Sequence, residues 1–93
     1  MKKTYTRIYK SKANDIMNNH DILGVEIIEC SKLIEKKYFN DQPGLSPVGL
    51  DYIKKGLPTR NLTKLKFTRS LNFLLKNKGA DAQYSLNEIF EIN

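Results

Sequence analysis

The sequence predicts a small, mainly α-helical domain that includes one short β-hairpin. The chain has 93 residues, which is enough for one domain with a single modest hydrophobic core. Apolar residues recur at three- and four-residue spacing across residues 27–34, and the capping residues Ser46 and Gly56 enclose a second helical segment. Near Leu65, apolar and basic residues instead alternate with a period of two, which favours a strand.

The N-terminal part, residues 1–24, is predicted to be a basic arm. Its segment Thr4–Tyr9 is rich in β-prone residues in loose alternation and favours a short strand or extended segment. Residues 13–20 are compatible with a helical turn around Ile16 and Met17.

The first well-marked helix is predicted over residues 28–37. Its apolar face carries Ile27, Cys30, Leu33 and Ile34, and we expect these side chains to face the core. Glu29 precedes Lys32 and Lys36 by three and four residues, which adds ion-pair support on the solvent side. The run from Asn40 to Gly44 contains turn-forming residues and predicts a loop.

The second helix has clear signals at both ends. Ser46 provides an N-cap oxygen, Pro47 suits the first helical position, and Gly56 suits the residue after the helix. Lys54 and Lys55 fall in the last turn, where positive charge favours the helix dipole.

A hairpin over residues 59–67 and two further helical segments complete the prediction. Lys64 and Lys66 alternate with Leu65 and Phe67, which indicates a strand with one buried and one basic face. A helix carrying Leu71, Leu74 and Leu75 follows and ends near Gly79. The segment Ser85–Glu88 has capping-box spacing and opens a short helix.

Positive charge is concentrated in two blocks of the sequence. The net charge is +6; residues 1–12 carry five basic side chains and no acidic one, and residues 46–69 carry six basic side chains and one acidic one. Such blocks indicate contact with a polyanion at two places. The alternative is a well-solvated, lysine-rich surface.

Several classes of function are disfavoured. Unbroken apolar runs reach only three residues, so we expect no transmembrane helix, and no apolar segment of a signal peptide follows the basic start. One cysteine (Cys30) and one histidine (His20) cannot form an internal disulfide or a structural zinc site. We expect Cys30 in the core because it lies at an apolar helix position, and His20 in a solvated loop because its neighbours are polar. No acidic side chains are grouped with a histidine as a catalytic set would be, so we predict that the protein is not an enzyme. We also predict no cofactor, no metal and a cytoplasmic, nucleoid-associated location.

The order of these elements resembles a known DNA-binding family. The stretch Leu50–Arg60, followed by Lys64–Phe67 and Leu71–Leu74, resembles the winged helix-turn-helix of MerR-type regulators and phage excisionases. The resemblance covers about residues 26–79 and implies a winged helix-turn-helix domain over 25–79. It implies that helix 46–55 enters the major groove of DNA and that the 59–67 wing contacts the backbone or the minor groove.

The resemblance also implies a set of site residues. The expected DNA-binding residues are Ser46, Val48, Gly49, Asp51, Tyr52, Lys54, Lys55, Arg60, Lys64 and Lys66. The acidic tail, residues 80–93, carries Leu86, Ile89 and Phe90, which we interpret as a partner-binding stripe unless they complete the core. Tyr5, Tyr9, Tyr38 and Phe39 lie among basic residues and suit either stacking on single strands or core filling.

The function implied by this reading is a small bacterial, phage or mobile-element transcription regulator that binds double-stranded DNA. We expect an activator acting at promoters with RNA polymerase or an adaptor protein. The alternatives are an excisionase that directs recombination, a basic module that docks an acidic protein partner, and an RNA-binding protein.

Overall fold

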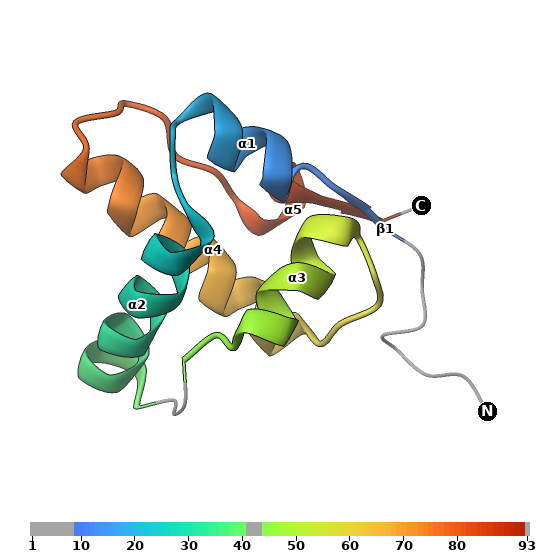
Figure 1. Ribbon diagram of the computed structural model, residues 1–93, viewed down its shortest axis with the longest axis horizontal. Coiled ribbons are helices and arrows are strands. Elements are labelled where there is room, and N and C mark those ends of the chain that lie inside the picture. The colour runs from blue at the N-terminus through green and yellow to red at the C-terminus, as the bar shows by residue number, and fades with distance from the viewer. Residues whose placement is uncertain (1–8, 41–43, 93) are drawn as a thin grey trace.

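Helices make up most of the structure, and two short strands bring its ends together (Figure 1). The computed structural model describes residues 9–40 and 44–92. In chain order the elements are β1 (Tyr9–Ser11), α1 (Ala13–Asn19), α2 (Gly24–Ile34), the π-helical turn η2 (Glu35–Phe39), α3 (Pro47–Lys55), α4 (Asn61–Asn77), α5 (Leu86–Ile89) and β2 (Phe90–Ile92). The predicted mainly α class is therefore confirmed, and the small antiparallel sheet is formed by β1 and β2 instead of the predicted hairpin.

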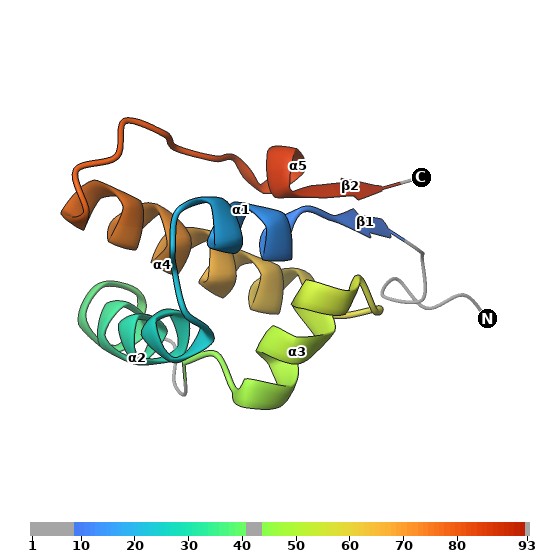
Figure 2. The same cartoon turned by 45° about the horizontal axis from the view of Figure 1, so that its top comes forward.

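The long helix α4 lies at the centre of the molecule. In Figure 2, α2 and α3 lie on one side of it, while α1 and the C-terminal segment lie on the other. Its buried face meets side chains from all of these elements, and the fully buried members of the core are Ala13, Ile27, Ile53, Phe67, Leu71, Leu75 and Ile89. Across the part of the chain that the structure describes, no helix is both long and apolar enough to cross a membrane.

The predicted hairpin over residues 59–67 is wrong, because α4 begins at Asn61 and runs through this segment. The alternation around Leu65 covers only two periods. Phe67, Leu71 and Leu75 recur every four residues and are all fully buried. This helical period extends the predicted 71–75 stripe backwards by one turn, and burying Phe67 on that stripe requires a helix. The described residues contain no wing.

The small sheet joins the two ends of the chain instead. β1 and β2 pair antiparallel, with Lys10 opposite Glu91. The Lys12 backbone N–H donates to the Ile89 carbonyl at 2.9 Å, and the Lys12 ammonium lies 3.0 Å from the Glu91 carboxylate. The pairing brings α1 against the same core as α5.

The predicted arm and tail both contribute to the core. α1 confirms the helical turn expected over residues 13–20, and Ile16 and Met17 are buried on it. At the other end, the Ser85 capping box is confirmed: its hydroxyl accepts from the Glu88 N–H at 3.3 Å, and its own N–H donates to the Glu88 carboxylate at 2.7 Å. The predicted strand Thr4–Tyr9 lies outside the described residues except for Tyr9, which begins β1.

The first predicted helix exists, but it begins earlier and changes its hydrogen-bonding pattern. It starts at Gly24, and its last turn becomes the π-helical η2. Cys30 and Ile34 are buried as predicted, whereas Leu33 is 71% exposed. The buried stripe runs through Ile27, Cys30 and Ile34, and Leu33 falls outside it.

Both predicted ends of the second helix are confirmed in α3. The Ser46 hydroxyl accepts from the Gly49 N–H at 3.0 Å, and Gly56 adopts φ 75°, a left-handed conformation that suits glycine. Before α3, Gly44 packs directly against α2, because a Cβ at this position would lie 2.7 Å from both the Lys32 backbone nitrogen and the Ser31 hydroxyl. The Leu45 N–H donates to the same hydroxyl at 2.7 Å.

Candidate nucleic-acid interface

The predicted DNA-binding residues of α3 form an exposed stripe. Val48, Asp51, Tyr52 and Lys55 are exposed at the spacing of one helix face. Lys55 lies 3.0 Å from Asp51, so the charges of this stripe pair with each other. Ser46, Gly49 and Lys54 also lie on α3 or at its start: Ser46 caps the helix, Gly49 faces Thr63 of α4, and Lys54 is half-buried.

Lys64 is not available as the predicted phosphate contact. It is only 7% exposed, and its ammonium lies 5.8 Å from the centroid of the Phe90 ring. Burial lowers the pKa of Lys64 because the charged form loses hydration. With the hairpin replaced by a helix, Lys64 turns towards the core while its neighbour Lys66 stays partly accessible.

Arg60 and Lys66 lie along α4 rather than on a wing. Arg60 is the exposed residue that immediately precedes the helix. Farther along, five residues share one outer face of the helix, because they follow i, i+4, i+7, i+11 and i+14 spacing. We call this face the α4 stripe, and its residues are Leu62, Lys66, Arg69, Phe73 and Lys76. The whole of α4 contains no acidic residue.

Arg69 in the middle of the α4 stripe is held by a buried acid. Its guanidinium donates to the Glu35 carboxylate at 2.7 Å, and Glu35 is fully buried. The other face of the contact is aromatic, since the Arg69 guanidinium carbon lies 3.7 Å from the centroid of the Phe39 ring. Glu35 and Phe39 are the first and last residues of η2, so the π-helical turn provides both partners. Single π-helical turns of this kind are frequently found at functional sites.

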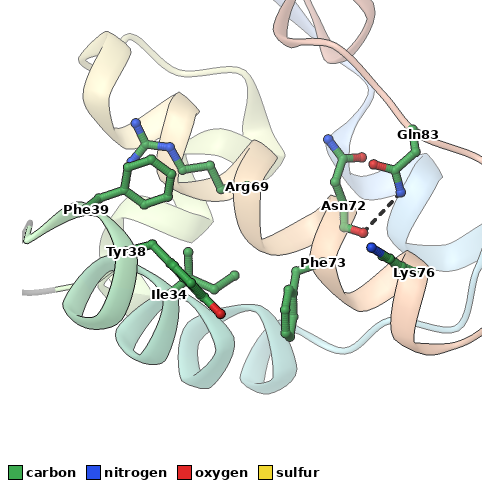
Figure 3. A pocket seen from close by; sticks show the side chains of 8 residues that line it. All are labelled: Ile34, Tyr38, Phe39, Arg69, Asn72, Phe73, Lys76 and Gln83. Carbon is green, nitrogen blue, oxygen red and sulfur yellow. Dashed lines mark hydrogen bonds between the residues drawn. The ribbon is translucent and has the colours of Figure 1, made fainter.

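A shallow hollow of about 400 Å³ lies between η2, α4 and the C-terminal segment (Figure 3). We call it the aromatic groove, and its lining residues are Ile34, Tyr38, Phe39, Arg69, Asn72, Phe73, Lys76 and Gln83. Figure 3 shows Tyr38 and Ile34 on one side and Phe73 on the other, with Phe39 beneath Arg69 at one end.

Sequence reasoning found only part of this groove. The sequence predicts Tyr38 and Phe39 either for stacking on single strands or for the core, and they are 61% and 44% exposed. Phe73, Arg69 and Lys76 are not among the predicted site residues, because the prediction for the 71–79 helix rests only on its buried leucine face. Continuing the helical period of Phe67 would have placed all three on one outer face. Tyr5 lies outside the described residues.

The predicted partner-binding stripe is mostly core. Ile89 is fully buried and Phe90 is 2% exposed, with its ring edge-on to Phe67 at 6.0 Å. Leu86 is half-buried against the same cluster. The alternative that these residues complete the core is therefore what the structure shows.

The remaining reactive side chains are engaged in structure. Cys30 is buried with its sulfur 3.8 Å from the Ser70 carbonyl oxygen, and burial raises the pKa of its thiol. His20 differs from the predicted solvated residue, because its ring nitrogen lies 3.2 Å from the Tyr84 hydroxyl. Within residues 9–40 and 44–92, no group of three or more histidine, cysteine or acidic side chains is placed to hold a metal ion.

Comparison with known proteins adds no relative. No protein-family model, no curated protein and no solved structure matches the chain.

Proposed function

We propose that the protein binds double-stranded DNA through the α4 stripe and Arg60. The observation that carries this proposal is the charge of α4, a seventeen-residue helix with four basic side chains and no acidic one. Three of those cations, Lys66, Arg69 and Lys76, lie on the α4 stripe. Phosphates supply most of the affinity of DNA for such surfaces.

The dimensions of the stripe support contact with more than one row of phosphates. Lys66 and Lys76 of the stripe are ten residues apart, which corresponds to about 15 Å along a helix. The major groove of B-DNA is about 12 Å wide, so these two cations span a single groove. Arg60 and Lys76 have no ion-pair partner among residues 9–40 and 44–92, so neither has to leave a protein acid to bind phosphate.

This proposal moves the main contact from α3 to α4. α3 offers an outward stripe with one Asp51–Lys55 pair and few base-reading side chains. On α4, Arg60 and Asn61 stand at the exposed start of the helix, where a guanidinium and an amide suit guanine and adenine edges. We expect modest sequence preference and a large backbone contribution.

A transcription regulator remains the role that we propose for this DNA binding. In that role RNA polymerase or an adaptor protein would supply affinity that one small domain lacks. Genome-wide occupancy separates this role from that of an excisionase: binding at many promoters supports a regulator, and binding at one attachment site supports recombination.

Titration with duplex DNA at several salt concentrations tests the proposal. We expect log K to fall with log[salt], and the Arg60→Gln, Lys76→Gln double variant to reduce that slope by about 1.8, because each lost phosphate contact removes about 0.9. Lys78→Gln is the matched control, since Lys78 lies 3.5 Å from Glu26 of α2 and outside the α4 stripe. Equal slopes for the double variant and the wild type would contradict DNA binding by α4. Selective binding to an acidic protein in its place would support the protein-docking alternative.

A further inference from the structure

Three large aromatic rings from distant parts of the sequence meet at the aromatic groove. Tyr38 and Phe39 come from η2, and Phe73 comes from α4 and is 43% exposed. Single exposed rings are ordinary on a protein surface. Three rings around one hollow form a patch, and contiguous exposed apolar patches mark binding sites.

Positive charge borders these rings. Lys37 places its ammonium 5.2 Å from the centroid of the Tyr38 ring, and Lys76 lines the groove beside Phe73. None of the described residues that line the groove is acidic. Glu35, the acid that pairs with the lining residue Arg69, is fully buried. The groove therefore presents flat apolar faces within a positive rim.

We propose that the aromatic groove binds single-stranded nucleic acid by stacking an unpaired base on Tyr38 and Phe73, with Lys76 at the neighbouring phosphate. Base faces and phosphates are the combination that a groove of rings and cations recognises, and every base offers such a face. A hollow of about 400 Å³ suits one ligand group of this size.

One polar group at the rim adds an interaction with a base edge. Gln83 donates its side-chain N–H to the Asn72 carbonyl at 3.2 Å, which fixes the amide beside the groove. Asn72 in turn holds this segment, because its side chain donates to the Tyr84 carbonyl at 2.8 Å and accepts from the Tyr84 N–H at 2.9 Å. The Gln83 side-chain oxygen is left to accept a hydrogen bond from a base.

This inference deepens the proposed function and rests on it for the phosphate contact of Lys76. A duplex keeps its bases stacked on one another, so only phosphates and groove edges reach the protein. An unpaired strand offers base faces as well. Substituting the rings therefore tests the groove, and substituting the cations tests the phosphate contact.

A Phe73→Trp variant reports directly on the groove, because the natural chain has no tryptophan. We expect its fluorescence to be quenched by an oligothymidylate and by an oligouridylate, whose relative strength distinguishes DNA from RNA. An abasic strand of the same length should cause little quenching. Quenching by the abasic strand as strong as that by the oligothymidylate would overturn stacking.

Affinity for the oligothymidylate gives a second, independent measurement. Tyr38→Leu and Phe73→Leu keep an apolar side chain without a stacking face, and each should weaken binding roughly five- to hundredfold. Tyr52→Leu on α3 is the matched control, since Tyr52 is 42% exposed and outside the groove. Duplex binding by Tyr38→Leu should stay within about twofold of the wild type, and thermal unfolding of each variant confirms that the fold is intact.

Three outcomes would contradict the proposal. The first is unchanged oligothymidylate binding by both leucine variants. The second is an equal loss in Tyr52→Leu. The third is stronger quenching by an acidic peptide of alternating glutamate and leucine, which would assign the groove to a protein partner. If duplex binding fails while the oligothymidylate still quenches the tryptophan, the proposed duplex function is wrong and the groove proposal stands.

Discussion

The two helices α3 and α4 follow one another in the chain, yet they present opposite kinds of surface. On α3 the outward charges Asp51 and Lys55 neutralise each other at 3.0 Å. On α4 the charged side chains of the outward stripe are all cations, although its central Arg69 pairs with the buried Glu35. An exposed pair of opposite charges gains little from a polyanion, whereas a cation without an ion pair among the described residues, such as Lys76, gains counterion release.

The difference also extends to how each helix is held. α3 is short and is held by its capping residues and by the close packing of Gly44 against α2. α4 runs through the core, where Phe67, Leu71 and Leu75 are fully buried and stabilise it over residues 67–75. A long, buried helix presents its outer side chains in a fixed geometry, which favours recognition of a regular ligand.

The largest effect is expected where the α4 stripe joins the core. Arg69→Met should lower the free energy of unfolding by about 3 kcal/mol, because it leaves the buried Glu35 carboxylate without its charge partner. Chemical denaturation measures this loss. The double variant Glu35→Gln, Arg69→Met removes both charges and should recover at least half of it. A single variant as stable as the wild type would show that the Glu35–Arg69 pair does not fix the stripe.

The sequence predicts the ends of α3 but not the start of α4. The ends of α3 were predictable because Ser46, Pro47 and Gly56 act through local backbone geometry. The start of α4 was not, because the two-residue alternation at Leu65 competed with the four-residue period of Phe67 and Leu71. Burial against α2 decides between them, and burial depends on residues distant in sequence.

The candidate site was predictable to a similar extent. Arg60 and Lys66 were identified by charge, and charge does not depend on whether the segment is a strand or a helix. Lys64 was misplaced because the hairpin put every second residue outside, whereas the helix turns it inward. The Glu35–Arg69–Phe39 contacts join residues more than thirty positions apart through a π-helical turn, and no local pattern predicts them.

The second-largest loss of stability is expected at Gly44, which packs against α2 just before α3 begins. Gly44→Ala should lower the free energy of unfolding by about 2 kcal/mol, because the added methyl group would overlap the α2 backbone at Lys32. Gly49→Ala, inside α3, provides the contrast: its Cβ would lie 3.2 Å from the Ser46 hydroxyl and 3.4 Å from the Thr63 methyl group, while alanine favours the helix by about 1 kcal/mol. Thermal unfolding of both variants compares the two positions. Equal stability would show that the loop before α3 moves aside freely.

A comparison of single charges separates the two helices as DNA ligands. Lys76→Gln on α4 should reduce the salt slope of duplex binding by about 0.9. Lys55→Gln on α3 should reduce it by less, because Lys55 gives up its contact with Asp51 to bind phosphate. Fluorescence anisotropy at four salt concentrations measures both. A larger loss for Lys55→Gln would return the main contact to α3.

The smallest effect concerns the inward-facing cation of α4. Lys64→Met should change the free energy of unfolding by less than about 1.5 kcal/mol at pH 7, since it replaces a largely buried side chain of similar length. The lowered pKa of Lys64 means that the unfolded chain binds more protons than the folded chain between the folded pKa and 10.5. In that window the wild type gains stability with rising pH relative to Lys64→Met, and below it the difference between the two proteins is constant. Urea denaturation of both proteins from pH 7 to pH 10.5 measures the difference. A difference that moves in the opposite direction would mean that Lys64 is stabilised as a cation in the fold, and it would then count among the basic residues that α4 offers to DNA.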